Sequence, residues 1–244
     1  MITKTKGIVI NEVNYGETSK ILTVLTEDYG SIGIMAKGAR TMKSKLRGVS
    51  QKLVYGEFSI NKKDKGLSSL HEVSVVNSFK NIFNDINKAG YAFYIIDLLK
   101  QVLKDNNDPN IFHILESALI KINDDINPHF ITDIVEIKML KYLGVSLELE
   151  MCVICGKQDN FRTISIEYGG LICCDCYKDG YIFDSKTIKL IRIMYFVDIM
   201  KIDKVTITDD KVMRELDDFI REYYTQYTGI YLKNKDAIGK WLIF

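Results

Sequence analysis

The chain has 244 residues, 47% of them hydrophobic and 27% charged, and its formal net charge is +1. This length and apolar content suit one large domain or two to three small ones with real cores, so the sequence predicts a globular, soluble protein. The longest uncharged apolar run, residues 91–96, is too short to cross a bilayer, and the first residues lack the apolar stretch of a secretory signal. We therefore expect no membrane partner and a cytoplasmic location.

The near-neutral total hides a basic N-terminal part. Residues 1–80 carry 13 Lys and Arg against 7 Asp and Glu, a net charge of +6, whereas the remainder carries 20 against 25, a net charge of −5. This asymmetry indicates that the first part of the chain meets a polyanion.

The first part has the pattern of a small β-structure, in which short apolar runs alternate with turns that contain glycine. The runs lie at residues 7–10, 21–26, 32–36, 53–60 and 70–76. Five short strands within about 75 residues predict a small barrel or sandwich.

Beyond Phe79 the spacing of apolar residues changes from two to about 3.6, which is typical of helices. The predicted helices cover residues 82–103, 109–122, 128–143, 185–200 and 209–228. Asp108 is expected to cap the second helix, and Gly144 to end the third. The final residues 239–244 are too apolar for a solvated end, so we expect them to dock on a core.

Four cysteines form two C-x-x-C pairs with seventeen residues between the pairs. They are Cys152, Cys155, Cys173 and Cys176. This spacing is typical of two knuckles that fold over one tetrahedral Zn²⁺. Four thiolates leave no open coordination position, so the metal is expected to be structural. Cys174 would break the knuckle spacing and is interpreted as a spare thiol.

Two other interpretations of these cysteines are disulfides and unligated core thiols. Disulfides are rare in a reducing cytosol, and four thiols rarely take this double spacing by chance. Gly156 follows the first pair, and Gly169 and Gly170 precede the second, where a ribbon needs backbone angles that favour glycine. Zinc is therefore the preferred interpretation of an element at residues 150–178.

A basic segment lies between the third and fourth predicted strands. Residues 37–47 contain five cations and no acid, and residues 37–65 carry a net charge of +7. The candidate phosphate-binding residues are Lys37, Arg40, Lys43, Lys45 and Arg47, with Lys62, Lys63 and Lys65 on a neighbouring hairpin turn as weaker candidates. A solvated surface is the plainer interpretation, but small barrels of the OB type bind single strands through such a groove.

Bases would also need aromatic side chains on which to stack. The candidates are Tyr15, Tyr29, Tyr55 and Phe58, each of which could equally be a packing residue. Binding of this kind is chiefly electrostatic and tolerant of sequence.

Motifs of common enzyme classes are absent from the sequence, including the P-loop, the nucleophile elbow and the zinc-protease and zinc-deaminase signatures. His71, His113 and His129 are scattered and are interpreted as ordinary packing or surface residues. The pairs at 124–125 and 209–210 are interpreted as helix-end charges rather than metal-binding carboxylates. We expect no independent catalytic activity.

Several short motifs in order resemble the bacterial RecO recombination mediators. They are Gly7-Ile8-Val9-Ile10, Tyr15-Gly16-Glu17, Thr26-Glu27-Asp28-Tyr29-Gly30, Ala36-Lys37-Gly38-Ala39-Arg40, Cys152-x-x-Cys155-Gly156, Gly169-Gly170-Leu171 and Cys173-x-x-Cys176. The likeness spans nearly the whole chain. Two departures are Thr41, where the family often carries a basic residue, and the extra thiol of Cys174.

The resemblance implies a multidomain α+β fold. An N-terminal five-stranded OB-fold barrel at residues 1–79 would precede a helical domain at 80–244, into which a Cys₄ zinc element is inserted. It also implies a DNA repair role in association with the nucleoid. RecO-like proteins bind single- and double-stranded DNA, anneal complementary strands and, with RecR, help to load RecA on DNA coated by single-strand binding protein, whose apolar-acidic tail is a further expected partner. Some family members lack the zinc cysteines, which favours a structural ion.

Two alternatives of other classes remain open. A zinc-ribbon factor that binds structured RNA or ribosomal particles would use the same barrel and basic loop. An enzyme whose zinc turns over substrate would need one thiolate to exchange for water.

Overall fold

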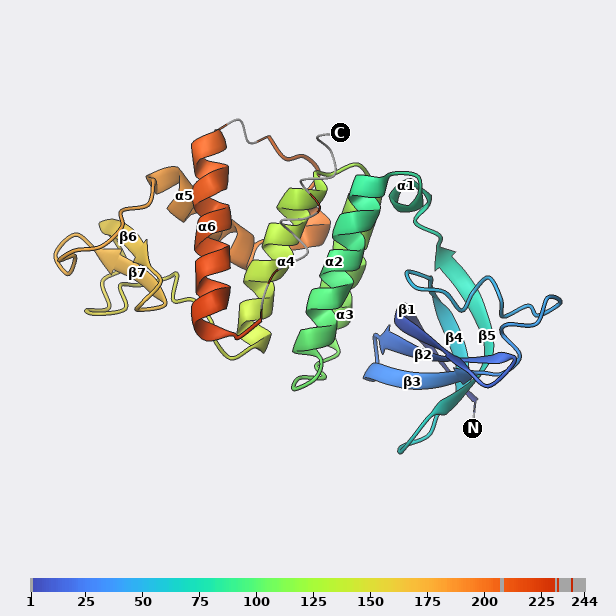
Figure 1. The fold of residues 1–244 in the computed structure, drawn as a ribbon. Coiled ribbons are helices and arrows are strands. Elements are labelled where there is room, and N and C mark those ends of the chain that lie inside the picture. Colours follow the sequence, from blue (N-terminus) through green and yellow to red (C-terminus); the bar gives the residue numbers. More distant parts are fainter. Residues whose placement is uncertain (1, 207–208, 231, 233–237, 239–244) are drawn as a thin grey trace.

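The computed structural model describes residues 2–206, 209–230, 232 and 238. Three parts follow one another along the molecule in Figure 1: a β-barrel, a group of helices and a small β-hairpin element. The predicted docking of residues 239–244 lies outside the described residues. In the part of the chain that is described, no helix is both long and apolar enough to pass through a bilayer.

The barrel is built from β1 (Ile2–Tyr15), β2 (Ser19–Thr26), β3 (Gly30–Ala36), β4 (Tyr55–Asn61) and β5 (Ser68–Asn77). It closes in the order β1-β2-β3-β5-β4, with β1 antiparallel to β4 and β3 parallel to β5. The prediction of a small five-stranded barrel is confirmed, and the barrel is an OB-fold. β1 is longer than predicted because its first, largely polar residues also pair with β4. The prediction missed them because they do not form an apolar run.

The two faces of the barrel strands are buried in different ways. Val9, Leu22 and Phe58 belong to a core inside the barrel, whereas Ile8, Ile10 and Leu25 belong to a core shared with the helices. Alternation along β1 therefore sends successive side chains to two different cores. Gly7 is needed at this closely packed point, because a Cβ there would lie 2.6 Å from Val24.

The helical part consists of α1 (Lys80–Phe83), α2 (Ile86–Val102), α3 (Asn110–Asn123), α4 (Pro128–Tyr142), α5 (Ser185–Phe196), the 3₁₀ helix η1 (Ile199–Lys201) and α6 (Asp210–Tyr227). The prediction of one helix from residue 82 is wrong at its start. The side chain of Asp85 accepts hydrogen bonds from the backbone N–H groups of Asn87 and Lys88, and this N-cap begins α2 separately from α1. The single helix predicted for 185–200 likewise ends at Phe196.

Barrel and helices share one continuous core. The ring of Tyr55, at the start of β4, stacks on Phe79 and meets Phe112 of α3 edge-on, and its hydroxyl donates to the carboxylate of Glu116. At the β2–β3 turn, the Asn107 amide accepts from Ser31 N at 2.6 Å and donates to Tyr29 O at 3.3 Å. The barrel is therefore fixed to the helices at two separate places.

The third part is the hairpin of β6 (Phe161–Ser165) and β7 (Gly170–Cys173). The hydroxyl of Tyr227 on α6 donates to the backbone oxygens of Ile166 and Glu167 in the hairpin turn, at 2.9 and 2.7 Å. The hairpin is thus attached to the helical part through α6.

Candidate nucleic-acid interface and metal centre

The basic segment forms an ordered loop, residues 37–54, that links β3 to β4. Its inner side is fixed to the barrel: Ala39 is buried in the barrel core, Leu46 packs against that core, and Arg40 N donates to Thr18 O at 2.8 Å. Lys20 of β2 donates to Ser50 O at 3.1 Å near the other end of the loop. A loop held by its backbone and small apolar side chains can leave its charged side chains free for solvent.

The five predicted cations of this loop are all exposed. They are Lys37, Arg40, Lys43, Lys45 and Arg47. Arg40 Nη1 donates to Gly16 O at 3.1 Å in the β1–β2 turn, so its side chain also braces the loop. Among the described residues, none of the five lies in an ion pair. Their positive charge is therefore uncompensated by neighbouring carboxylates.

The three weaker candidates do not extend this patch. The basic loop leads into the start of β4, whereas the three lysines Lys62, Lys63 and Lys65 follow the end of that strand. A strand of seven residues is about 20 Å long, so the two groups of cations lie at opposite ends of β4. Lys62 lies 3.5 Å from Asp64 and 4.7 Å from the centroid of the Tyr29 ring. Of these three lysines, Lys63 and Lys65 are exposed, and the acid Asp64 between them is exposed as well. Figure 1 shows this turn at the tip of the β4–β5 hairpin.

Of the four aromatic candidates, two are packing residues. Phe58 is fully buried in the barrel, and Tyr55 is buried at the junction with the helices. Tyr29 is half-buried beneath Lys62. Tyr15 is 55% exposed and directly precedes Gly16, which Arg40 contacts. Of the four candidates, Tyr15 is therefore the one that is both exposed and next to a residue that the basic loop contacts.

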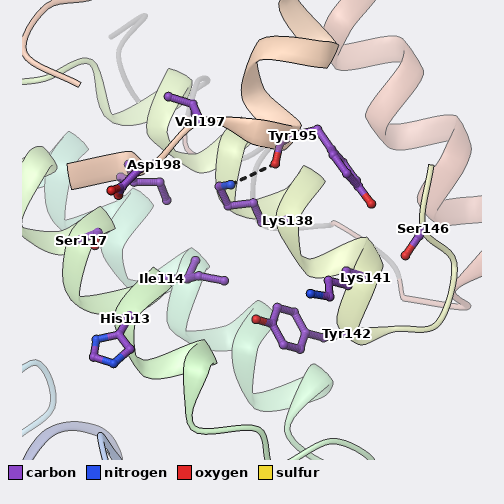
Figure 2. A pocket seen from close by; sticks show the side chains of 11 residues that line it. His113, Ile114, Ser117, Lys138, Lys141, Tyr142, Ser146, Tyr195, Val197 and Asp198 are labelled. Atoms are coloured by element: carbon purple, nitrogen blue, oxygen red, sulfur yellow. Dashed lines mark hydrogen bonds between the residues drawn. The ribbon is translucent and has the colours of Figure 1, made fainter. Parts of the chain in front are cut away.

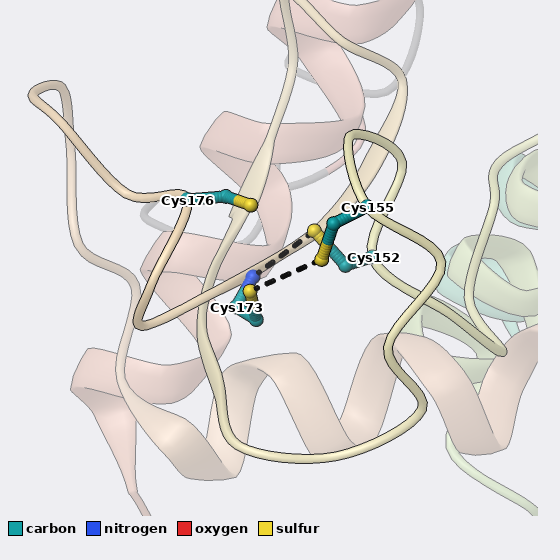
Figure 3. Close-up of side chains that lie close together, drawn as sticks. All are labelled: Cys152, Cys155, Cys173 and Cys176. Carbon is teal, nitrogen blue, oxygen red and sulfur yellow. Dashed lines mark hydrogen bonds between the residues drawn. The ribbon is translucent and has the colours of Figure 1, made fainter.

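The four predicted cysteines come together at the end of the hairpin (Figure 3). All four sulfur atoms lie within 4.8 Å of one another; they belong to Cys152, Cys155, Cys173 and Cys176. Cys155 Sγ is 3.6 Å from Cys173 Sγ. Four thiolates around one ion at 2.3 Å would lie about 3.8 Å apart. The arrangement could therefore hold one metal ion with all four sulfurs. Cys174 is exposed and outside this group, as predicted.

Local backbone geometry brings the two cysteine pairs together. Gly156 has φ 76° directly after Cys155, which turns the first knuckle. Gly170 has ordinary φ, contrary to the sequence interpretation, and is needed because the backbone oxygen of Glu148 lies against it, where a Cβ would clash. Leu171 N donates to Glu148 O at 3.0 Å, so the first knuckle is held beside β7.

The thiols interact strongly with one another and with the backbone. Burial raises the pKa of Cys152, but hydrogen bonds from the backbone N–H groups of Cys173, Cys155 and Ile154 outweigh it and lower the pKa to about 6. The pKa of Cys176 is raised to about 12, chiefly by its hydrogen bond with the Cys155 sulfur and to a smaller extent by burial. The site thus favours a first thiolate at neutral pH, and a bound cation would favour loss of the remaining protons.

A cavity of about 450 Å³ lies on the helical part, between α3, α4 and the segment that follows α5 (Figure 2). Its lining combines the cations Lys138 and Lys141 with Ile114, Tyr142 and Tyr195. Lys138 donates to Tyr195 O at 3.0 Å, and burial lowers its pKa. The cavity thus combines apolar walls with two cations and one carboxylate, that of Asp198.

The histidines are placed unequally. His71 and His113 are exposed, with His113 3.5 Å from Glu116 of its own helix. His129 Nε2 lies 3.0 Å from Asp217 Oδ1 and 3.6 Å from Asp133 Oδ1, so its ring interacts with two carboxylates. The spacing of His129 and Asp133, one helical turn apart, was visible, but Asp217 comes from another helix. Asp209 is a helix N-cap, as expected for a helix-end charge.

Comparison with known proteins adds the biological context. A family described as "Recombination protein O N terminal" matches residues 1–79, and one described as "Recombination protein O C terminal" matches residues 84–236. The chain is 36% identical over 239 residues to DNA repair protein RecO of Bacillus subtilis strain 168, covering 96% of this chain and 93% of the relative. It is 34% identical over 244 residues to DNA repair protein RecO of Bacillus pumilus, covering 98% and 94%.

An OB-fold barrel with an ordered cationic loop, joined to helices and a four-cysteine element, places the chain in the class of bacterial DNA repair proteins. The chain belongs to the recombination protein O (RecO) family.

Proposed function

We propose that this chain is a non-catalytic, DNA-binding recombination mediator that acts in the cytoplasm, in association with the nucleoid. It binds single- and double-stranded DNA, anneals complementary strands and, with RecR, assists loading of RecA on DNA coated by single-strand binding protein. The observation that carries the proposal is the ordered loop 37–54, which presents exposed cations outside ion pairs at one end of an OB-fold barrel.

The loop binds DNA by replacing counterions along the phosphate backbone. Each cation that contacts a phosphate of a single strand contributes about 0.7 to the slope of log K against log salt, so five contacts give a slope of about −3.5. Contacts of this kind carry no sequence information. An exposed Tyr15 ring beside Gly16 supplies a stacking surface for a base.

Annealing follows from the same chemistry. Two complementary strands repel each other through their phosphates, and a cationic surface lowers this repulsion while leaving the bases free to pair. Because the loop reads no sequence, any complementary pair is a substrate.

The four cysteines hold one structural Zn²⁺ per chain in this proposal. Thiolates are ligands for which zinc has high affinity, and the separation between Cys155 Sγ and Cys173 Sγ fits tetrahedral coordination. When bound, the ion links the segment before β6 to the end of β7. With four protein ligands it leaves no position for substrate or water, which supports a bracing role.

The cavity between α3 and α4 is the best candidate for the apolar-acidic tail of single-strand binding protein. Its apolar walls suit the tail's hydrophobic residues, and Lys138 and Lys141 suit its carboxylates. A peptide with this tail should bind the chain, and Lys141→Glu should weaken the binding because it reverses an exposed charge at the cavity. Lys186→Glu, outside the cavity lining, is the matched control; equal effects of the two changes would reject this cavity.

An annealing assay with complementary DNA strands tests the main proposal. The chain should accelerate annealing at near-physiological salt, and the variant Lys37→Ala/Arg40→Ala/Lys43→Ala should lose most of this acceleration. The alternative of a zinc-ribbon RNA- or ribosome-binding factor predicts no acceleration with DNA. That result, together with binding to structured RNA, would overturn the proposal.

A further inference from the structure

A second cavity, of about 700 Å³, lies between the hairpin of β6 and β7, the segment that follows this hairpin, and α6. Figure 1 shows these elements at the end of the molecule away from the barrel. The DNA-binding loop and the cavity beside α3 therefore have no part in it. From its lining we infer that this cavity is a docking site for a basic segment of a partner protein, one that carries arginine and aliphatic side chains.

The floor of the cavity is apolar. Ile164 of β6, Ile172 of β7 and Phe219 of α6 line it and are buried. Phe183 lies edge-on against Phe219, with ring centroids 5.6 Å apart. A cavity of this size accommodates several side chains. An aliphatic side chain that enters it leaves water, which favours binding.

The rim carries negative charge that the protein does not neutralise. Five carboxylates line the cavity, against the guanidinium group of Arg221. Two of them have a cation beside them: Asp218 pairs with Arg221, and Glu215 Oε1 lies 3.7 Å from Lys211 Nζ. The other three are exposed and lie in no ion pair within the described part of the chain; they are Glu167, Asp179 and Glu222. This excess favours a cationic partner and repels phosphates.

Two tyrosine rings stand at the rim beside these acids. Tyr168 is 57% exposed and Tyr181 is 63% exposed. The hydroxyl of Tyr181 donates to the buried carboxylate of Glu215 at 3.0 Å, which holds this ring in place. A guanidinium group stacks on aromatic rings and donates two parallel hydrogen bonds to a carboxylate, whereas an ammonium group is a compact point charge. The combination of rings and carboxylates therefore favours arginine over lysine.

The walls of the cavity are joined before any partner binds. Tyr227 of α6 donates to the backbone oxygens of Ile166 and Glu167 in the hairpin turn, and Thr163 Oγ1 of β6 donates to Tyr181 O at 3.0 Å. A preformed site loses little conformational entropy on binding. Because the site is separate from the loop at residues 37–54, a partner can be held here while DNA is held at the barrel.

The test uses the full chain and a short fluorescein-labelled peptide in which arginine alternates with leucine. Fluorescence anisotropy should show binding that weakens as salt is raised. The variant Glu167→Gln/Glu222→Gln should bind the peptide about tenfold more weakly, because two exposed ion pairs together contribute up to about 25-fold. Peptides with lysine in place of arginine, or glycine in place of leucine, should also bind more weakly. A photoreactive copy of the peptide should cross-link to residues 163–183 or 215–225.

Asp105→Asn/Asp124→Asn is the matched control. It removes two exposed carboxylates that lie in no ion pair of the described residues and do not line the cavity. Peptide affinity should stay unchanged in this control. The inference is overturned if the two double variants bind the peptide equally, if the lysine or the glycine peptide binds as well as the original, or if the cross-links lie elsewhere. The cross-linking readout needs no variant to fold.

Discussion

The cations of the barrel loop and those of the helical part differ in their partners. Lys37, Lys43 and Arg47 are exposed and lie in no ion pair of the described residues. Outside the barrel, Lys157 beside the cysteine hairpin pairs with Asp175, and Lys186 Nζ of α5 lies 3.1 Å from Asp209 Oδ2. In one region the cations are available to phosphates, whereas in the other several of them are neutralised by carboxylates of the protein.

The difference teaches that residue counts alone do not identify a DNA-binding surface. The helical part also contains many lysines, but carboxylates beside several of them cancel the local field that would attract a polyanion. The loop achieves its field by excluding acids from residues 37–47 and by fixing its backbone to the barrel.

The largest expected effect comes from removing the metal site. This change should not alter the difference between the unpaired cations of the loop and the paired cations elsewhere. Cys152→Ser/Cys176→Ser should lose the bound ion and melt earlier, because structural zinc contributes about 10–16 kcal/mol in small zinc peptides, and that energy is folding energy. Metal analysis and thermal unfolding measure both. Cys174→Ser should change neither, and DNA affinity should stay nearly constant in both variants. A double variant with full metal content would contradict the four-cysteine assignment.

Removal of loop cations should weaken DNA binding, because it removes the unpaired charges that distinguish the loop from the rest of the protein. Lys37→Ala/Arg40→Ala/Lys43→Ala should reduce the salt slope for single-stranded DNA by about 2 and weaken binding about 100-fold at about 0.1 M salt. Fluorescence anisotropy across a salt series measures both. The matched variant Lys157→Ala/Lys186→Ala/Lys201→Ala removes three exposed cations that lie in ion pairs. Equal losses in the two variants would show that net charge, and not the loop, determines binding.

A smaller effect is expected at the junction between the two regions. Burial raises the pKa of Tyr55, so its hydroxyl remains a donor to Glu116 at neutral pH. Tyr55→Phe should cost about 1.5–3 kcal/mol, the range for hydrogen bonds to charged groups. Urea unfolding measures the change. Tyr15→Phe is the control, since Tyr15 is exposed. An equal loss of unfolding free energy in this control would show that the hydrogen bond at the junction is not the cause.

The smallest effect concerns the acids of the helical part. Burial alone would raise the pKa of Glu215, but hydrogen bonds from Thr187, Asp184 N and Tyr181, together with the Lys211 charge, lower it below its ordinary 4.5. A carboxyl with a lowered pKa in the folded state contributes stability above its unfolded pKa and loses it as the pH falls through the folded value. The unaltered chain should therefore have a higher free energy of unfolding than the variant Glu215→Gln at about pH 6, and urea unfolding should show this difference decreasing as the pH falls to about 3. An advantage constant over this range would contradict the hydrogen-bonded carboxylate.

Much of the architecture was predictable because it depends on local patterns. Glycine turns and short apolar runs define the barrel, and the cysteine spacing brings four sulfurs together. The break before α2 was missed because the capping role of Asp85 interrupts an otherwise regular apolar spacing. Ile86 fits the helical pattern and is nevertheless 84% exposed, since periodicity does not say which face is covered.

The parts of the site that were not predictable depend on contacts between distant segments. Tyr55 and Phe58 looked like stacking candidates, but both are buried, one against α3 and one within the barrel. Lys62 and Lys37 lie in the same basic stretch of sequence, yet strand β4 separates them. Asp217 joins His129 only because α6 packs beside α4. Sequence spacing carries no information on such pairings.

The shared core between barrel and helices has a mechanical consequence. Tyr55 and Asn107 fasten the barrel to α3 and to the segment before it, and the cysteine hairpin is attached at the far side through α6 (Figure 1). A rotation of the barrel about one of its two attachments would break the other, so the pair of contacts sets the orientation of the barrel relative to α3.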